Sequence, residues 1–472
     1  RRGMEKKNIN DYLNDDVCIG LVENVDTQKI MVSVEKEAIL NSLKINDIVI
    51  LSGSNADEKL IGILTKVSKK RVEVSEELDG SEDVLYSNNY CMITLVGSFY
   101  NKLGANNINK FKRAINTYPE INSKVYQANE TAMSMIMNAL SGESKAEKSL
   151  TIGHFASNRD VPAILDGNRF FQRHACIVGS TGSGKSYTVA NILEKTNELP
   201  HANMIVFDLH GEYNELSYAD HICINDEANG LHIPLWFFNY EEMHSLFVES
   251  SEGTSTNQRA AVINYILKEK KQYLIDHMPA ISHEIITADT PIPFSAAGLM
   301  EYLEEQNIYE IDTGEKYKSG AKEGQAKTKQ GQYYDKLTNL ITRLRTKMDD
   351  KKYGFVFNEN DTTEADYLNK FAERIMGNQT NRIKVIDLSE VPSDMLAIVI
   401  GVVTRIIYDI QFWMTPGKEE VRHPLVFVCD EAHIYMANDM SKMKAVEKRS
   451  LEIFEKIAKE GRKYGIGLLI VS

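Results

Sequence analysis

The sequence contains few cysteines and no arrangement that would give them a function. Its 472 residues include five, which are odd in number, far apart and never spaced as Cys-x-x-Cys. This excludes a disulfide scaffold and a zinc site, whose ligands come in closely spaced pairs. Most of them lie in apolar stretches, so we expect buried, reduced thiols, as in a cytoplasmic protein. They are Cys18, Cys91, Cys176, Cys223 and Cys429.

Long hydrophobic runs are also missing. The longest covers 395–403, about half of the roughly 20 residues that a membrane-spanning helix needs. We therefore expect a buried helix there, with no membrane contact and no signal segment. The chain has 54 Lys and Arg against 67 Asp and Glu, a formal net charge of −13. An acidic balance argues against a simple nucleic-acid coat but allows a local basic channel.

The first hundred residues favour a small β-barrel. Short segments rich in Val and Ile are separated by turn residues at near-regular spacing, which is typical of barrel strands. These segments are 17–25, 29–34, 47–53, 60–67, 71–78 and 91–99. We expect the barrel to occupy residues 4–105. A helical linker at 106–149 is expected to follow, with a helix over 107–140 that is interrupted near Pro119.

From about residue 150 the sequence is typical of a parallel α/β sheet. The apolar runs become continuous instead of alternating, as strands buried on both faces require, and helical patterns separate several of them. The expected strands are 175–180, 204–210, 383–389, 425–431 and 467–472. We divide this part into a sheet domain in two pieces, 150–213 and 383–472, with a helical insertion at 214–382.

The insertion at 214–382 is expected to form a subdomain of its own. Its helical segments are 240–249, 258–277, 294–306, 333–348 and 363–376. Residues 313–332 have almost no large apolar side chains, so we expect a mobile loop there. Residues 315–352 contain 11 Lys and Arg against 5 Asp and Glu. A solvated face is the ordinary explanation of such a run, and a surface for DNA phosphates is the alternative.

The strongest chemical signal is the segment Gly179-Ser-Thr-Gly-Ser-Gly184-Lys185-Ser186. It fits the phosphate-loop pattern GxxxxGK[ST], follows an expected strand and opens an expected helix at 187–198. Loop glycines let backbone amides turn toward phosphates, and the helix N-terminus adds partial positive charge. Lys185 would neutralise the β- and γ-phosphate oxygens of ATP, and Ser186 would hold Mg²⁺. The expected nucleotide-binding residues are Gly179, Ser180, Thr181, Gly182, Ser183, Gly184, Lys185, Ser186 and Tyr187.

Two adjacent carboxylates, Asp430 and Glu431, end the expected strand 425–431. In phosphate-loop ATPases a carboxylate at this place holds Mg²⁺ through water, and a following glutamate deprotonates the attacking water. We assign these roles to the pair; an acidic pair that opens a helix is the alternative. The pair argues against a small-molecule kinase, which has no use for an activated water. A third cluster, Asp208 to Tyr213 with His210, ends another strand, where polar side chains face a nucleotide.

In order and spacing, these segments resemble the HerA family of the HerA–FtsK ATPase superfamily. The likeness covers 150–472 and includes RHACIVGSTGSGKS, FDLHGEY, VFVCDEAHIYM and EGRKYGIGLLIVS. It implies a RecA-like core in a hexameric ring of identical subunits, which hydrolyses ATP to move along double-stranded DNA in its central pore. It also implies an effector protein on the barrel face, a nuclease or a sirtuin-like NAD-consuming enzyme, in anti-phage defence.

The resemblance also implies two catalytic arginines, Arg462 and Arg173. With them, the expected catalytic residues are Lys185, Glu431, Arg462 and Arg173. Arg462, 31 residues after Glu431, matches the family's arginine that reaches a neighbour's γ-phosphate. Arg173, 12 residues before Lys185, matches a second arginine near the subunit boundary. Family members continue with a sensor glutamine and a C-terminal brace, which would follow Ser472. An ATP-dependent assembly scaffold that recruits and activates an effector is the alternative function.

Overall fold

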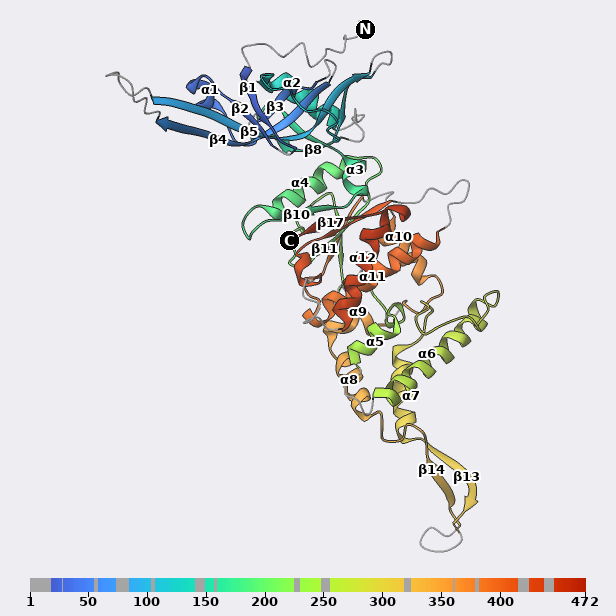
Figure 1. Ribbon diagram of the computed structural model, residues 1–472. Helices are drawn as coiled ribbons and strands as arrows, with labels where there is room; N and C mark the ends of the chain where they lie inside the picture. The colour runs from blue at the N-terminus through green and yellow to red at the C-terminus, as the bar shows by residue number, and fades with distance from the viewer. Residues whose placement is uncertain are drawn as a thin grey trace, which may run out of the picture. The chain divides into compact units, whose positions relative to one another are not determined.

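The computed structural model of the chain divides into two compact units, Arg1–Asn168 and Arg169–Ser472, each with its own hydrophobic core (Figure 1). The residues that the structure describes are 18–27, 29–54, 58–73, 85–102, 107–140, 149–156, 159–224, 230–247, 255–317, 324–359, 361–377, 382–414, 424–436 and 445–472.

The first unit contains the expected β-barrel. Its antiparallel sheet runs in the order β2-β1-β7-β3-β4-β5-β6, and β2 also pairs with β5, which closes the first six of these strands into a ring. Closure leaves no free edge among those six, and their inward side chains, such as Val22, Val32 and Ile93, are fully buried. The strands are β1 (Cys18–Val25), β2 (Ile30–Ser33), β3 (Ile48–Ser52), β4 (Glu58–Glu73), β5 (Leu85–Lys102), β6 (Asn107–Lys112) and β7 (Lys124–Gln127).

The helix expected over 107–140 is wrong in its first half. This stretch forms β6 and β7, and only α2 (Glu130–Leu140) is helical. β7 has four residues and is held between β1 and β3, so pairing with distant strands outweighs its local pattern. The segments expected at 60–67 and 71–78 are parts of the single strand β4, and residues 74–78 lie outside the described residues.

Three further elements complete the first unit. α1 (Glu37–Ser42) lies between β2 and β3 in the chain, and β8 (Ser149–His154) pairs with β9 (Pro162–Asp166) as an antiparallel hairpin. β9 contacts α2. The hairpin therefore falls within the compact unit that carries the barrel, although the sequence pattern alone places residue 150 at the start of the sheet domain.

The second unit is built on a parallel sheet in the order β10-β17-β16-β11-β15-β12. All five expected strands are present, and every residue of β11 and β16 is buried, as their continuous apolar runs predict. The sixth strand, β12, has four residues and was not expected. The strands are β10 (Ala175–Ile177), β11 (Met204–Asp208), β12 (Asp220–Cys223), β15 (Ile383–Asp387), β16 (Leu425–Cys429) and β17 (Ile466–Val471).

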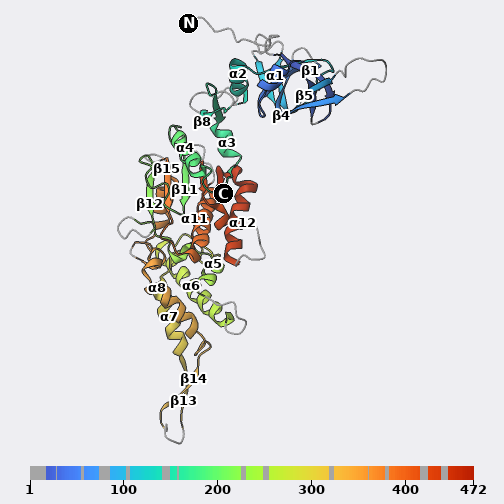
Figure 2. The same cartoon turned by 90° about the vertical axis from the view of Figure 1, so that its left-hand side faces the viewer.

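Helices cover this sheet. After α3 (Gly167–Gln172), α4 (Lys185–Asn197) follows β10, while α11 (Ser393–Trp413) and α12 (Ala445–Glu460) pack against one another beside the strands (Figure 2). α11 is long and apolar enough to cross a membrane, but 67% of its most apolar 18-residue window is buried inside the protein. It is therefore the core helix that the run at 395–403 predicts.

The insertion between β12 and β15 is mostly helical, with its helices within a few residues of the expected positions. Within 313–332, expected as a loop, residues 313–316 and 326–330 instead belong to an exposed hairpin of β13 (Glu310–Lys316) and β14 (Ala326–Gln330), which projects beyond α7 and α8 in Figures 1 and 2. Residues 318–323 of the expected loop lie outside the described residues. Neither strand has a buried face, so neither has the alternation that predicts a strand. The helices are η4 (Leu235–Phe237), α5 (Tyr240–Phe247), α6 (Ser255–His277), α7 (Ala296–Ile308), α8 (Thr338–Asp349), η5 (Lys351–Tyr353), α9 (Gly354–Phe357) and α10 (Tyr367–Met376).

None of the five cysteines, all of which lie among the described residues, forms a disulfide, and they are not all buried. Cys91 and Cys429 are buried, and burial raises the pKa of each thiol to about 12, which keeps both protonated and unreactive. Cys176 and Cys223 are exposed, contrary to expectation, because they lie on β10 and β12, the two edge strands of the parallel sheet.

Candidate functional site

The carboxyl edge of the parallel sheet gathers three of the segments singled out in the sequence. The phosphate loop follows β10, the acidic pair follows β16, and the segment that starts at Asp208 follows β11. All strands of the sheet are parallel, so these segments emerge at the same edge. The amide of Gly179 donates to the carbonyl oxygen of Ser472 at 3.1 Å, which joins the loop to the end of β17.

The loop between β10 and α4 depends on its glycines. Gly182 and Gly184 have φ angles of 78° and 92°, in the left-handed region that side chains other than glycine rarely adopt. A Cβ atom at either position would meet nothing within 4 Å, so open space faces both. At Gly179 a Cβ atom would collide with the Oγ atom of Ser183. The glycines therefore keep the loop tight and its concave side open.

The N-terminus of α4 is open to an anion. The helix begins at Lys185 with no side-chain cap and no acidic residue in its first turn, so its first amides lack partners that would compete with a phosphate. The Nζ atom of Lys185 donates to the carbonyl oxygen of Gly179 at 3.0 Å and so lies across the loop. Ser186 is half-buried beside it, and Tyr187 is exposed. These residues fit a nucleotide's phosphates.

Asp430 is buried at the end of β16, with only 5% of the residue exposed. Its Oδ2 atom accepts a hydrogen bond from the hydroxyl of Tyr213 at 2.9 Å, and its Oδ1 atom accepts one from the amide of Glu431 at 2.9 Å. Burial raises the pKa of the Asp430 carboxyl, and the two hydrogen bonds oppose this by stabilising the charged form. The carboxylate is thus fixed in one orientation.

Glu431 has a strained backbone, with a φ of 45°. Its side chain does not cap the short helix that follows, η6 (Ala432–Ile434), so the helix-opening explanation of the acidic pair does not describe what this side chain does. The Oε2 atom instead lies 3.1 Å from the Nδ1 atom of His433. With a quarter of its side chain exposed, Glu431 is open to water, as a base that deprotonates water must be.

Hydrogen bonds to the carboxylate of Asp208 hold the segment from Asp208 to Tyr213. Asp208 is completely buried and accepts three backbone amides, from His210 at 3.2 Å, Glu212 at 3.1 Å and Tyr213 at 2.9 Å. Gly211 makes the turn possible with a φ of 71°. Asp208 therefore shapes this loop instead of facing a nucleotide, while His210 and Glu212 are exposed.

The two arginines are not brought to the phosphate loop of their own chain. Arg462 is exposed in η7 (Gly461–Tyr464), before β17, whereas the loop contacts Ser472 after β17. At about 3.3 Å per residue, β17 separates them by roughly 20 Å. Arg173 is exposed before β10, again at the opposite edge from the loop. The guanidinium of Arg462 has no hydrogen bond or ion pair with any residue that the structure describes.

A metal ion at this edge would need ligands from a nucleotide. Within the described ranges, no three or more His, Cys, Asp or Glu side chains gather closely enough to hold an ion by themselves. Asp430 and Ser186 offer a carboxylate and a hydroxyl, which suit Mg²⁺, an ion that usually shares one or two protein ligands with substrate phosphates. The donor set therefore fits Mg²⁺ bound together with ATP.

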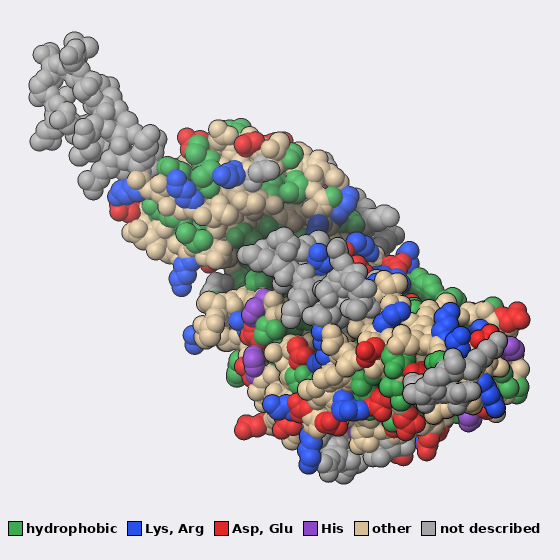
Figure 3. Space-filling view, turned by 90° about the horizontal axis from the view of Figure 1, so that it is seen from below, with side chains coloured by type: hydrophobic (Ala, Val, Ile, Leu, Met, Phe, Trp, Pro, Cys, Tyr) green, Lys and Arg blue, Asp and Glu red, His purple; other side chains and the backbone are tan. Residues whose placement is uncertain are grey.

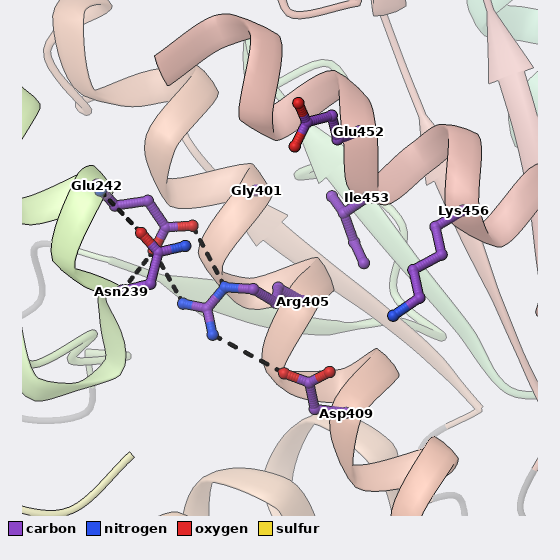
Figure 4. Close-up of a pocket in the computed structure, with 8 residues that line it drawn as sticks. All are labelled: Asn239, Glu242, Gly401, Arg405, Asp409, Glu452, Ile453 and Lys456. Atoms are coloured by element: carbon purple, nitrogen blue, oxygen red, sulfur yellow. Dashed lines mark hydrogen bonds and ion pairs between the residues drawn. The ribbon is translucent and has the colours of Figure 1, made fainter. Parts of the chain in front are cut away.

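A pocket that the sequence did not reveal lies away from this edge, among α5, α11 and α12 (Figure 4). It encloses about 200 Å³. Arg405 donates to Glu242 from Nη2 at 2.8 Å and from Nε at 3.3 Å, and to the carbonyl of Phe237 at 2.7 Å. This charged contact joins the helical insertion to the core. The pocket is lined by Asn239, Glu242, Gly401, Arg405, Asp409, Glu452, Ile453 and Lys456.

Comparison with known proteins assigns the family. Residues 150–407, more than half of the chain, match the family model described as Helicase HerA, central domain. The chain belongs to the HerA helicase family. It is 25% identical over 327 residues to the probable helicase MJ1565 of Methanocaldococcus jannaschii, which covers 68% of this chain and 53% of that protein. It is 26% identical over 306 residues to the DNA double-strand break repair helicase HerA of Saccharolobus solfataricus, covering 64% and 50%.

This HerA-family chain thus spans about half the length of these two relatives. Among solved structures, it is similar to the plasmid coupling protein TrwB in complex with an ATP analogue, with a TM-score of 0.40 and 12% identity, over 73% of this chain and 70% of that chain. The VirB4 structure from Thermoanaerobacter pseudethanolicus gives a TM-score of 0.42 and 14% identity, over 70% and 77%. Both likenesses are distant.

Proposed function

We propose that this HerA-family chain is a Mg²⁺-dependent ATPase that moves along double-stranded DNA as one subunit of a six-membered ring. One observation carries the proposal: an open phosphate loop, a buried aspartate and a strained, water-accessible glutamate emerge at the same edge of one sheet. The Saccharolobus relative is named a DNA double-strand break repair helicase, which supports duplex DNA as the substrate.

The residues of the phosphate loop bind and orient the nucleotide. The amides of 179–186 and the N-terminus of α4 hold the phosphates, and Lys185 moves its amine from the Gly179 carbonyl to their oxygens. Tyr187 is exposed on the first turn of α4, next to Ser186, and is proposed to contact the nucleotide. Ser186 and Asp430 would hold Mg²⁺. When bound, the ion neutralises phosphate charge and so favours transfer of the terminal phosphate to water.

Glu431 is the proposed base. Its carboxylate holds the attacking water and accepts its proton at Oε1, while its strained backbone fixes the side chain at the edge of β16. The Nδ1 atom of His433 lies within hydrogen-bond reach of Oε2, so Oε1 is the oxygen left for water.

Arg462 and Arg173 are proposed to act on a neighbouring subunit. Both are exposed, and both precede strands whose far ends lead to their own phosphate loop. A guanidinium is always charged and suits the developing charge on a transferred phosphate. A site completed by a second copy explains why such a motor would assemble as a ring.

The basic segment at 315–352 gives little support for a DNA contact. Three of its cations are paired with acids, Lys327 with Glu315, Arg345 with Glu304, and Lys347 with Asp394. Figure 3 shows Lys and Arg side chains interspersed with Asp and Glu across the face in view. These pairs favour the solvated-face explanation. Contacts to DNA in the pore would address phosphates without reading bases.

We further propose that the barrel is the platform for an effector, a nuclease or a sirtuin-like NAD-consuming enzyme, in cytoplasmic anti-phage defence. All the motif residues of the ATP site lie in Arg169–Ser472, so the barrel unit is free for another task. Its exposed apolar side chains include Ile45, Val96, Tyr118 and Ile121, which are the type of residue that protein partners bury.

A triplex-displacement assay tests the motor. The full-length protein is added to duplex DNA that carries a third strand, with ATP and Mg²⁺, and release of that strand is followed by fluorescence. Wild type is expected to release it and Lys185→Ala to fail. ATP hydrolysis by wild type without any release would reject the motor and favour the assembly scaffold.

A further inference from the structure

The strongest unassigned feature of the second unit is the contact between Tyr213 and Asp430. Tyr213 is buried to 99% in a loop that follows β11, and its hydroxyl ends 2.9 Å from the Oδ2 atom of Asp430, 217 positions later in the chain. Neither the phosphate-loop motif nor the acidic pair includes a tyrosine at this place. We propose that Tyr213 is a positioning residue that holds Asp430 for Mg²⁺, which rests on the proposed ATPase function.

The backbone of Tyr213 is fixed as firmly as its hydroxyl. Its amide donates to the Oδ2 atom of Asp208 at 2.9 Å, so this single residue binds one aspartate through its backbone and another through its side chain. The two aspartates directly follow Phe207 and Cys429, which lie opposite one another in the pairing of β11 and β16. Tyr213 therefore connects the ends of two adjacent strands.

The geometry leaves room on Asp430 for a cation. An ionised carboxylate has about four lone-pair directions, and here the hydroxyl of Tyr213 takes one on Oδ2 while the amide of Glu431 takes one on Oδ1. Each oxygen keeps another direction for the cation or its water. Because both oxygens are held, the carboxylate cannot rotate, and the free directions stay aimed at the edge of the sheet.

A buried carboxylate also needs hydrogen-bond donors to stay ionised when no cation is bound. Asp430 is only 5% exposed, and a buried charge that lacks hydrogen bonds is strongly disfavoured. The phenol is the only side chain among the described residues that donates to this carboxylate in the structure. Phenylalanine would fill the same space without the donor, so the substitution isolates the hydroxyl.

The test measures how much Mg²⁺ strengthens nucleotide binding. A fluorescent, non-hydrolysable ATP analogue is titrated into the full-length protein with and without Mg²⁺, and the ratio of the two dissociation constants is the metal's contribution. For Tyr213→Phe we expect unchanged metal-free affinity and a ratio lower by on the order of tenfold, the usual effect of losing a hydrogen bond to a charged group. Asp430→Asn should lose most of the ratio.

Two further variants separate positioning from a general loss of stability. Tyr265→Phe removes a comparably buried hydroxyl, which donates to the carbonyl of Ser295 at 3.0 Å in the helical insertion, and should keep the wild-type ratio. In the double variant Tyr213→Phe/Asp430→Asn, the loss of the hydroxyl should change nothing further, because its only role is exerted through Asp430.

The outcomes are distinct. If wild type binds the analogue no better with Mg²⁺ than without it, the proposed ATPase function itself fails. If wild type shows the enhancement and Tyr213→Phe retains all of it, the assignment of Tyr213 is overturned and the ATPase stands. If Tyr213→Phe lowers the ratio to the same extent whether or not Asp430 is present, the residue acts by some other route and the proposal is equally overturned.

Discussion

The contact between Arg405 and Glu242 gives a sharp prediction about stability (Figure 4). The Glu242 side chain, on α5, is 8% exposed, and the Arg405 side chain, on α11, is 18% exposed. Arg405→Met keeps a long side chain but removes the guanidinium, so among the described residues only the amide of Asn239 still donates to the Glu242 carboxylate. The carbonyl of Phe237 loses its hydrogen bond from Arg405 as well.

The magnitude follows from burial. Removing one partner of a buried ion pair costs about 3–5 kcal/mol. Because Arg405 is partly exposed, we take the low end, about 3 kcal/mol. For a unit as large as Arg169–Ser472, each kcal/mol lowers the unfolding midpoint by about 2 °C, so we expect a decrease of roughly 6 °C.

Thermal unfolding followed by circular dichroism measures this decrease. The matched control is Arg345→Met, which breaks a pair with Glu304 in which the two side chains are 55% and 41% exposed. A surface pair contributes about 1 kcal/mol or less, so the control should move the midpoint by at most about 2 °C. Equal shifts for the two variants would refute the claim that burial gives the Arg405 contact its weight.

Three further predictions concern the nucleotide site. Glu431→Gln should bind ATP as wild type does, because the phosphate loop is intact, but its turnover rate should fall by a factor on the order of 10²–10⁴, because the base is gone. Steady-state hydrolysis and a binding titration check this, and a normal turnover rate would contradict it. Gly184→Ala places a side chain at a φ of 92°, which costs about 1–2 kcal/mol, so the affinity for the nucleotide should fall several-fold. An unchanged affinity in the binding titration would contradict the loop geometry. Arg462→Ala subunits alone should assemble but barely hydrolyse ATP, and mixing them with Lys185→Ala subunits should restore part of the ATPase activity. If rings shown to contain both variants recover no activity, the arginine acts within its own subunit.

The parallel sheet could be predicted because burial leaves a strong mark on sequence. Strands buried on both faces, such as β11 and β16, must be apolar throughout. Five of the six strands of the sheet have such apolar runs in the sequence. β12, with the sequence DHIC, is too short and too polar to do so. The hairpin of β13 and β14 buries nothing, and β7 is a strand only because β1 and β3 lie on either side of it. Neither has a local signal.

The residues of the candidate site, like the strands, can be predicted from the sequence only where the signal is local. The phosphate loop is a local motif, since glycine positions, lysine and helix start all lie within eight residues, and the acidic pair is readable at the end of its strand. The role of Tyr213 depends on a contact with Asp430, 217 positions away, which only the pairing of β11 with β16 creates. The place of Arg462 is predictable, because it precedes the last expected strand whereas the phosphate loop follows its own strand, and the structure has it at the edge opposite the loop.

We propose that the sheet edge bearing Lys185 and Asp430 hydrolyses ATP with Mg²⁺. The most direct test is the rate of phosphate release from ATP by the full-length protein, measured for wild type and for Lys185→Ala with and without Mg²⁺. We predict release by wild type that requires Mg²⁺, and none by Lys185→Ala, whose loop has lost the amine that lies across it. Release by Lys185→Ala at the wild-type rate, or release by wild type that is indifferent to Mg²⁺, would contradict the account.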